Sequence, residues 1–196
     1  MTATKPKVQT VHITYAAMFI ALMAIGANLT AFITLGGVPL TFQTVVAVLA
    51  GIILGKKLGT LAIAGYILLG LTGVPIFAGF SGGVSVLASP TFGFLVSFLF
   101  IAFSSGFVME LMKTKTKSGF FIAGLTGLLF NYGIGVPYLY FYTVTILGVT
   151  DTSFLLIAGG MSAFFIKDLI LVFFTAALAA QLYSRRAIRP VWQQAA

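Results

Sequence analysis

Long apolar runs take up most of this chain, and most of its charged residues lie in short segments outside them. Only 7% of the 196 residues are Asp, Glu, Lys or Arg, and 60% are hydrophobic. A soluble domain of this length would carry about a quarter charged residues. Several of the runs approach the roughly 20 residues that a helix needs to cross the hydrocarbon core of a bilayer. The sequence therefore predicts an all-α integral membrane protein.

Six of the runs are predicted to be transmembrane helices of one domain that covers residues 1–196. Glycine, proline or charged residues separate them, as is typical of turns. The fifth run is interrupted by two glycines and a proline, and we expect a loop with a short helix to follow it at residues 138–160. The predicted spans are residues 13–35, 40–54, 58–72, 90–112, 120–136 and 162–183.

The basic residues predict the orientation of these spans. All eleven Lys and Arg residues except Lys167 lie in the two terminal tails, the loop after the second span and the loop after the fourth. With six spans these segments share one side, and because Lys and Arg concentrate on the cytoplasmic side, both termini are predicted to be cytoplasmic. The glycine-rich turns at residues 36–39 and 73–83 then lie outside, where they predict a pocket open to the exterior.

Several functional classes are disfavoured by residues that the chain lacks. It has no Cys, one His and three acidic residues, so we expect no disulfide framework, metal centre or cofactor. A small intramembrane enzyme is disfavoured, because one carboxylate alone lies inside the spans and acid–base catalysis usually needs a second group. No phosphate-binding Gly-Lys-Ser/Thr loop is present, so the chain cannot power transport by itself. The net charge is +8. It comes from basic residues that flank the spans, and this placement does not indicate nucleic acid binding.

Lys167 and Asp168 are adjacent charges within the last apolar run. A charge at this depth costs on the order of 3 kcal/mol and usually faces a cavity or a partner. Because helical neighbours point about 100° apart, we expect the two side chains not to pair with each other but to reach different parts of one cavity. A fitting ligand has a carboxylate for Lys167 and N–H donors for Asp168. Alternatively, Lys167 extends to the outer headgroups and Asp168 has a structural role.

Other polar side chains near the outer ends of the spans are candidate ligand contacts. A buried amide needs partners, so an amide here either contacts the ligand or forms an interhelical hydrogen bond. Serine hydroxyls can donate to a ligand or bond to their own backbone, and a tyrosine can stack on a ring or belong to the interfacial aromatic belt. The amide candidates are Asn131 and Gln43, the serine candidates are Ser85 and Ser89, and the tyrosine candidate is Tyr138.

Small residues four positions apart in the first span suggest a helix contact. Ala17 and Ala21 would let another helix approach closely. The other helix can belong to a partner protein or to the same bundle, and both alternatives stay open.

Four groups of residues, taken in order, resemble the signatures of a known family. They are residues 38–44 (VPLTFQT) with 55–59 (GKKLG), residues 70–77 (GLTGVPIF) with 82–83 (GG) and 89–95 (SPTFGFL), residues 132–139 (YGIGVPYL) and residues 167–170 (KDLI). Their order and spacing resemble BioY, the family of biotin-specific substrate-binding subunits (S components) of energy-coupling factor (ECF) vitamin transporters.

This resemblance implies a six-helix S component in the membrane of a prokaryotic cell that captures biotin from outside. It implies two kinds of partner, a transmembrane coupling subunit and two cytosolic ATPases, with Ala17 and Ala21 facing the former. Asp168 becomes the partner of the ureido ring, and Lys167 a candidate for the valerate carboxylate. Many family members also carry a lysine where this chain has Leu171. An S component for another vitamin, such as thiamine or riboflavin, is the alternative.

Overall fold

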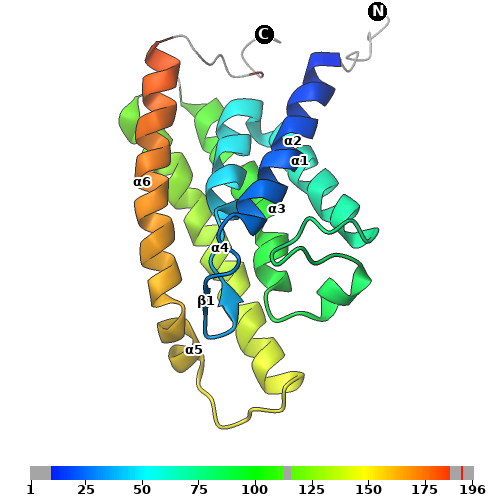
Figure 1. Ribbon diagram of the computed structural model, residues 1–196. Coiled ribbons are helices and arrows are strands. Elements are labelled where there is room, and N and C mark those ends of the chain that lie inside the picture. The colour runs from blue at the N-terminus through cyan, green and yellow to red at the C-terminus, as the bar shows by residue number, and fades with distance from the viewer. Residues whose placement is uncertain (1–9, 113–115, 186–190, 192–196) are drawn as a thin grey trace, which may run out of the picture.

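The apolar runs form helices that lie side by side in a bundle, with a small hairpin and several loops at one end (Figure 1). This computed structural model describes residues 10–112, 116–185 and 191. In chain order the elements are α1 (Thr10–Asn28), β1 (Thr34–Leu35), β2 (Val38–Pro39), α2 (Gln43–Leu71), the short 3-10 helix η1 (Val84–Ala88), α3 (Phe92–Leu111), α4 (Lys117–Thr145), α5 (Phe154–Gly160) and α6 (Ser162–Ser184).

The predicted membrane fold is confirmed. Five of the described helices are long and apolar enough to cross a membrane: α1, α2, α3, α4 and α6. Their outward faces carry large apolar side chains such as Phe173 and Phe174, which are more than half exposed. A helix that is apolar on its outer face as well as its inner face is typical of a membrane span.

The second and third predicted spans are the two halves of α2. Gly55 interrupts this element with φ 82° and ψ 170°, a conformation that is essentially restricted to glycine. The side-chain nitrogen of Gln43 then lies 3.0 Å from the hydroxyl of Tyr66, whereas a straight helix would separate these residues by roughly 35 Å. The two halves therefore run antiparallel, and the bundle has the six predicted spans.

α1 ends at Asn28. The sequence had predicted a span that continues to Leu35, and this boundary is wrong. The side chain of Asn28 donates to the carbonyl of Ile76 at 3.3 Å and accepts from the backbone N–H of Phe80 at 2.7 Å. These polar contacts attach the end of α1 to the loop before η1. The residues that follow form the hairpin of β1 and β2, whose two-residue Gly-Gly turn has positive φ at both positions, as hairpin turns of this type require.

α4 continues to Thr145, so the predicted interruption at residues 131–137 is wrong. Pro137 lies inside the helix and removes one backbone hydrogen bond. Gly135 allows α4 to approach α3 closely, because a side chain at this position would collide with the ring of Phe94. Packing against α3 therefore keeps the helix continuous despite its proline. The predicted short helix before the last span is α5, and the fourth and sixth predicted spans correspond to α3 and α6.

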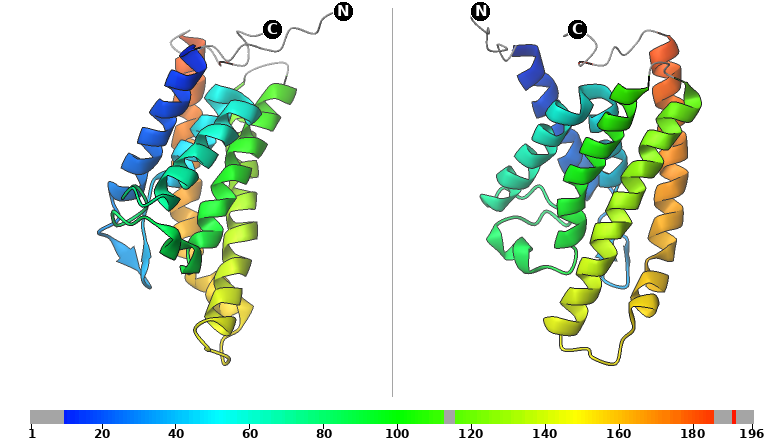
Figure 2. Two further views of the ribbon diagram at one scale, coloured as in Figure 1. Left: turned by 90° about the vertical axis from the view of Figure 1, so that its right-hand side faces the viewer. Right: turned by 180° about the vertical axis from the view of Figure 1, so that it is seen from behind.

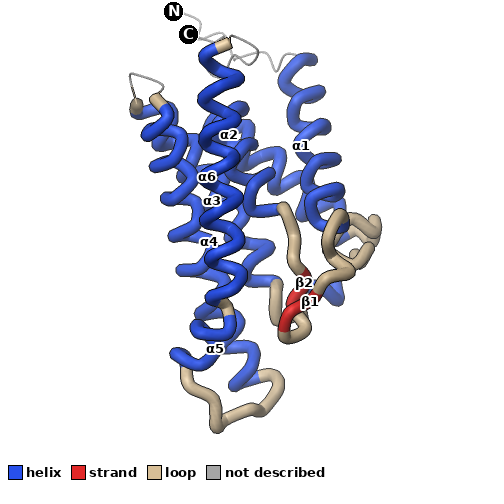
Figure 3. The backbone as a smooth tube through the Cα atoms, turned by 60° about the vertical axis from the view of Figure 1, so that its left-hand side comes forward, coloured by secondary structure: helices blue, strands red, loops and turns tan. Residues whose placement is uncertain are grey.

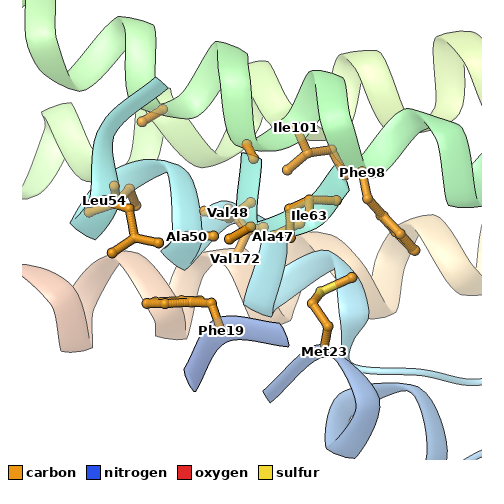
Figure 4. Close-up of a cluster of buried hydrophobic side chains, with 14 of the residues drawn as sticks. Phe19, Met23, Ala47, Val48, Ala50, Leu54, Ile63, Phe98, Ile101 and Val172 are labelled. Carbon is orange, nitrogen blue, oxygen red and sulfur yellow. The ribbon is translucent and has the colours of Figure 1, made fainter. Parts of the chain in front are cut away.

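The core of the bundle is formed by apolar side chains from most of its long helices. Figure 4 shows Phe19 and Met23 of α1 in one cluster with Ile63 of α2, Ile101 of α3 and Val172 of α6. A second, smaller group of buried residues lies toward the α5 end: Val136, Leu139, Met161 and Phe164.

The start of α1, the Gly55 turn, the end of α3 and the end of α6 share one end of the bundle (Figure 2). Of the basic residues that the structure describes, Lys56, Lys57, Lys117 and Arg185 belong to this end, and the remainder of the predicted basic clusters falls outside the described residues. The hairpin and α5 lie toward the opposite end (Figure 3).

Candidate functional site

A cavity of about 300 Å³ opens at the end of the bundle that carries the hairpin. Its polar wall comes from the first turn of α2, the middle of α4 and the first turns of α6. The loop before α3 and the hairpin cover its mouth, where Gly37, Ser81 and Ser89 lie. The cavity thus has the position that the sequence predicted, at the ends of the spans opposite the basic clusters.

Asp168 is the buried carboxylate of this cavity. Its Oδ2 accepts hydrogen bonds from the hydroxyls of Tyr132 at 2.8 Å and Thr44 at 3.2 Å. Its Oδ1 forms an ion pair with the ammonium of Lys167 at 2.9 Å. Within the part of the chain that the structure describes, Oδ1 has no hydrogen-bond partner besides this ion pair. A carboxylate oxygen can accept more than one hydrogen bond, and Asp168 lines the cavity, so Oδ1 can accept from a ligand there.

Lys167 pairs with Asp168, so the expectation that the two neighbours would not meet is wrong. Although their Cα–Cβ bonds diverge, the four-carbon stem of lysine is long enough to fold back. The ammonium also donates to the backbone carbonyl of Thr41 at 2.7 Å. The lysine side chain is 26% exposed against 5% for Asp168, which places the ammonium at the wetter edge of the site.

Asn131 contacts the cavity and also joins helices. Its amide oxygen accepts from Ser97 of α3 at 2.7 Å, and its amide nitrogen donates to Thr44 of α2 at 3.5 Å. Gln43 behaves in the same way, since it lines the cavity and donates to Tyr66, whose hydroxyl donates in turn to the carbonyl of Ile76 at 3.0 Å. The hydrogen bonds between helical segments that were predicted for these amides are therefore present, and contact with a ligand stays a prediction.

The hydroxyl candidates separate into one that lines the cavity and two that do not. Ser89 lies at the cavity mouth, 3.4 Å from the hydroxyl of Thr91. Ser85 is exposed on η1. Tyr138 is outside the lining, and its ring covers Gly93 while its hydroxyl donates to the carbonyl of Leu87 at 3.3 Å. Tyr138 therefore attaches η1 to α4.

The two residues that donate hydrogen bonds to Asp168, Thr44 and Tyr132, escaped the sequence-based selection. They directly follow the selected amides Gln43 and Asn131 and lie in the family-like stretches 38–44 and 132–139. A threonine in a span usually bonds to its own backbone and a tyrosine can belong to the aromatic belt, so residue type alone did not distinguish them. Aromatic residues complete the lining, including Phe77, Phe94, Phe98 and Phe164.

The arrangement can bind a small, partly apolar molecule that offers an N–H group to Asp168. Aromatic and aliphatic walls with a few placed polar groups are typical of ligand sites. The described residues contain no group of His, Cys, Asp and Glu side chains that could hold a metal ion.

Ala17 and Ala21 lie far from this cavity, on an exposed face of α1. Large side chains around them, such as Met18 and Ile25, are also exposed at 46% and 57%. Packing of these two alanines within the bundle is therefore excluded as their role.

Comparisons with known proteins identify the family of this chain. A family model described as the BioY family matches residues 1–188. The chain is 43% identical to the biotin transporter BioY of Thermotoga maritima over 127 residues, which cover 65% of this chain and 73% of the relative. It is 35% identical to the probable biotin transporter BioY of Lysinibacillus sphaericus over 187 residues, or 93% of each chain.

The fold is likewise similar to a known structure. A crystal structure of the S-component for biotin from an ECF-type ABC transporter superposes with a TM-score of 0.78, at 24% identity, over 93% of this chain and 95% of that one. At this identity the likeness concerns the fold, and the family assignment rests on the sequence matches. The chain therefore belongs to the BioY family.

Proposed function

We propose that this protein is the biotin-binding S component of an ECF-type transporter, which captures biotin from outside the cell. The observation that carries the proposal is the buried carboxylate of Asp168 in the lining of a mainly apolar cavity, where its Oδ1 is ion-paired with Lys167 and has no further hydrogen-bond partner among the described residues. Biotin offers such a donor in its ureido ring, and the relatives are named biotin transporters. Because the relatives are named as transporters, an intramembrane enzyme is not favoured. Because the named substrate is biotin, a thiamine or riboflavin carrier is not favoured either.

In this proposal the ureido N–H of biotin donates to Oδ1 of Asp168, while the aromatic wall covers the ring system. A hydrogen bond to a buried ionised acceptor contributes about 1.5–3 kcal/mol. Asn131, Gln43 and Ser89 are further polar groups within the cavity lining.

Lys167 remains the candidate partner of the biotin carboxylate, because it supplies a positive charge among the described lining residues. The carboxylate lies at the far end of the valerate chain from the ureido ring. Lys167 can reach it only if the ammonium leaves Oδ1 of Asp168 and the carbonyl of Thr41.

The proposed assembly contains a transmembrane coupling subunit and two cytosolic ATPases, which supply ATP hydrolysis. The exposed small-residue face at Ala17 and Ala21 supports a helix contact with the coupling subunit. The positions of Lys56, Lys57 and Lys117 support a cytoplasmic location for the end of the bundle that holds both termini, in the cell membrane.

Biotin binding to the purified protein tests this function directly. We expect saturable binding of labelled biotin that an excess of biotin displaces and that thiamine and riboflavin do not. Asp168→Asn is expected to weaken binding at least about tenfold, or about 1.4 kcal/mol. Asp151→Asn, at an exposed aspartate, is the matched control and should bind like the wild type. Unchanged affinity in Asp168→Asn, or equal competition by another vitamin, would refute the proposal.

A further inference from the structure

A chain of hydrogen bonds links Asp168 to three buried side chains on three other helices. Ser97 of α3 lies 2.7 Å from the amide oxygen of Asn131 on α4, whose amide nitrogen lies 3.5 Å from the hydroxyl of Thr44 on α2. That hydroxyl lies 3.2 Å from Oδ2 of Asp168 on α6. All four residues are buried, so each polar group depends on its neighbour for a partner.

The charge on Asp168 determines the direction of every bond in this chain. A carboxylate can only accept hydrogen bonds, and this carboxylate is paired with the ammonium of Lys167 at 2.9 Å. Thr44 must therefore give its single proton to Asp168 and accept from Asn131. Asn131 in turn must direct its nitrogen at Thr44 and its oxygen at Ser97, because the orientation of an amide follows from its hydrogen-bond network.

Ser97 is affected as well. Its hydroxyl lies 2.7 Å from the carbonyl of Phe94 in its own helix and 2.7 Å from the amide oxygen of Asn131. A hydroxyl has one proton, and only donation to Asn131 completes the chain. The Phe94 carbonyl within α3 and the Asn131 amide oxygen thus compete for the single hydroxyl proton of Ser97.

We propose that Thr44 is a positioning residue that acts on the ligand through Asp168. Thr44 and Tyr132 together occupy Oδ2, so the carboxylate is held with Oδ1, which is ion-paired with Lys167 at 2.9 Å, as its acceptor for an N–H donor. Thr44 need not touch the ligand for this effect. The inference rests on the proposed function, since it assigns to the biotin ureido group the place at Oδ1.

The test is a double-mutant cycle between Thr44 and Asp168, with biotin affinity measured by titration calorimetry on purified protein. Thr44→Val keeps the shape of the side chain and removes the hydroxyl, whereas Thr44→Ser restores it. We expect Thr44→Val to weaken biotin binding about tenfold in the wild-type background and less than about twofold in the Asp168→Asn background. Thr44→Ser should stay within about twofold of the wild type.

Thr126→Val is the matched control, because that hydroxyl donates to the carbonyl of Ile122 in its own helix. It should leave biotin affinity unchanged. Thermal unfolding of each variant establishes that it is folded, and Thr44→Ala replaces Thr44→Val in both backgrounds if the valine variant is not.

A purely structural role for Thr44 gives a different result, because the loss of affinity would then be equal in the two backgrounds. Equal losses, or no loss in either background, overturn the inference while the proposed function stands. Absence of biotin binding in the wild type overturns the proposed function, and the inference with it.

Discussion

The pairing of Lys167 with Asp168 makes it possible to test whether the lysine also binds the ligand carboxylate. We consider Lys167→Met, which removes the ammonium and keeps an unbranched side chain. The matching change in the ligand is biotin to its primary amide, which removes the negative charge of the valerate group. If the ammonium binds the carboxylate, the two changes should not be additive.

The expected coupling follows from the contacts of the ammonium. A hydrogen bond to a charged group contributes about 1.5–3 kcal/mol, and the 26% exposure of the lysine side chain places this site near the lower limit. Binding the carboxylate also requires the ammonium to give up Asp168 Oδ1 at 2.9 Å and Thr41 O at 2.7 Å. We therefore expect a coupling of about 1 kcal/mol, so that Lys167→Met weakens biotin about fivefold more than it weakens biotin amide.

Calorimetric titration of both ligands against both proteins gives the four affinities that are needed. Lys57→Met, at an exposed lysine of the opposite end, is the control and should alter neither affinity. Lys167→Met should weaken the amide as well, because Asp168 loses its counter-ion in either case. Losses that agree within about twofold for the two ligands would show that Lys167 serves Asp168 alone.

Two further predictions concern the turn in α2 and the exposed face of α1. Gly55→Ala should destabilise the fold by about 1–3 kcal/mol, because its backbone conformation is essentially restricted to glycine, and thermal unfolding in detergent measures the loss. Gly159→Ala, at a site with open space, is the control, and equal midpoints would contradict the strain argument. Ala17→Leu with Ala21→Leu should leave biotin affinity intact and abolish co-purification with the coupling subunit, since leucine prevents close helix approach. Ala177→Leu, at an exposed alanine of α6, is the control and should retain the complex. Loss of the complex in this control as well would show that Ala17 and Ala21 are not the contact.

The membrane class, the number of spans and the position of the cavity could be predicted because they depend on composition and charge placement. An apolar run of span length and a cluster of lysines have the same meaning wherever they occur. The same is true of the buried charge at Asp168, whose cost in hydrocarbon does not depend on details of packing.

The interruption predicted in α4 was wrong for a physical reason. Glycine and proline disfavour a helix locally, but Gly135 is required by the ring of Phe94 on another helix. Local propensity and tertiary contact give opposite indications at such a residue, and packing decides. The pairing of Lys167 with Asp168 was missed for a similar reason, because backbone direction alone ignores how far a lysine stem can reach.

The polar groups of the cavity depend on partners that are distant in the sequence. Thr44 meets Asp168 across 124 positions, and Gln43 meets Tyr66 only because α2 reverses at Gly55, toward the opposite end of the bundle. A change at that turn therefore alters the support of Gln43 without touching the site itself. Sequence patterns can thus identify polar residues that lie inside apolar spans. Which of them donates and which accepts each hydrogen bond follows only when the four helices are placed together.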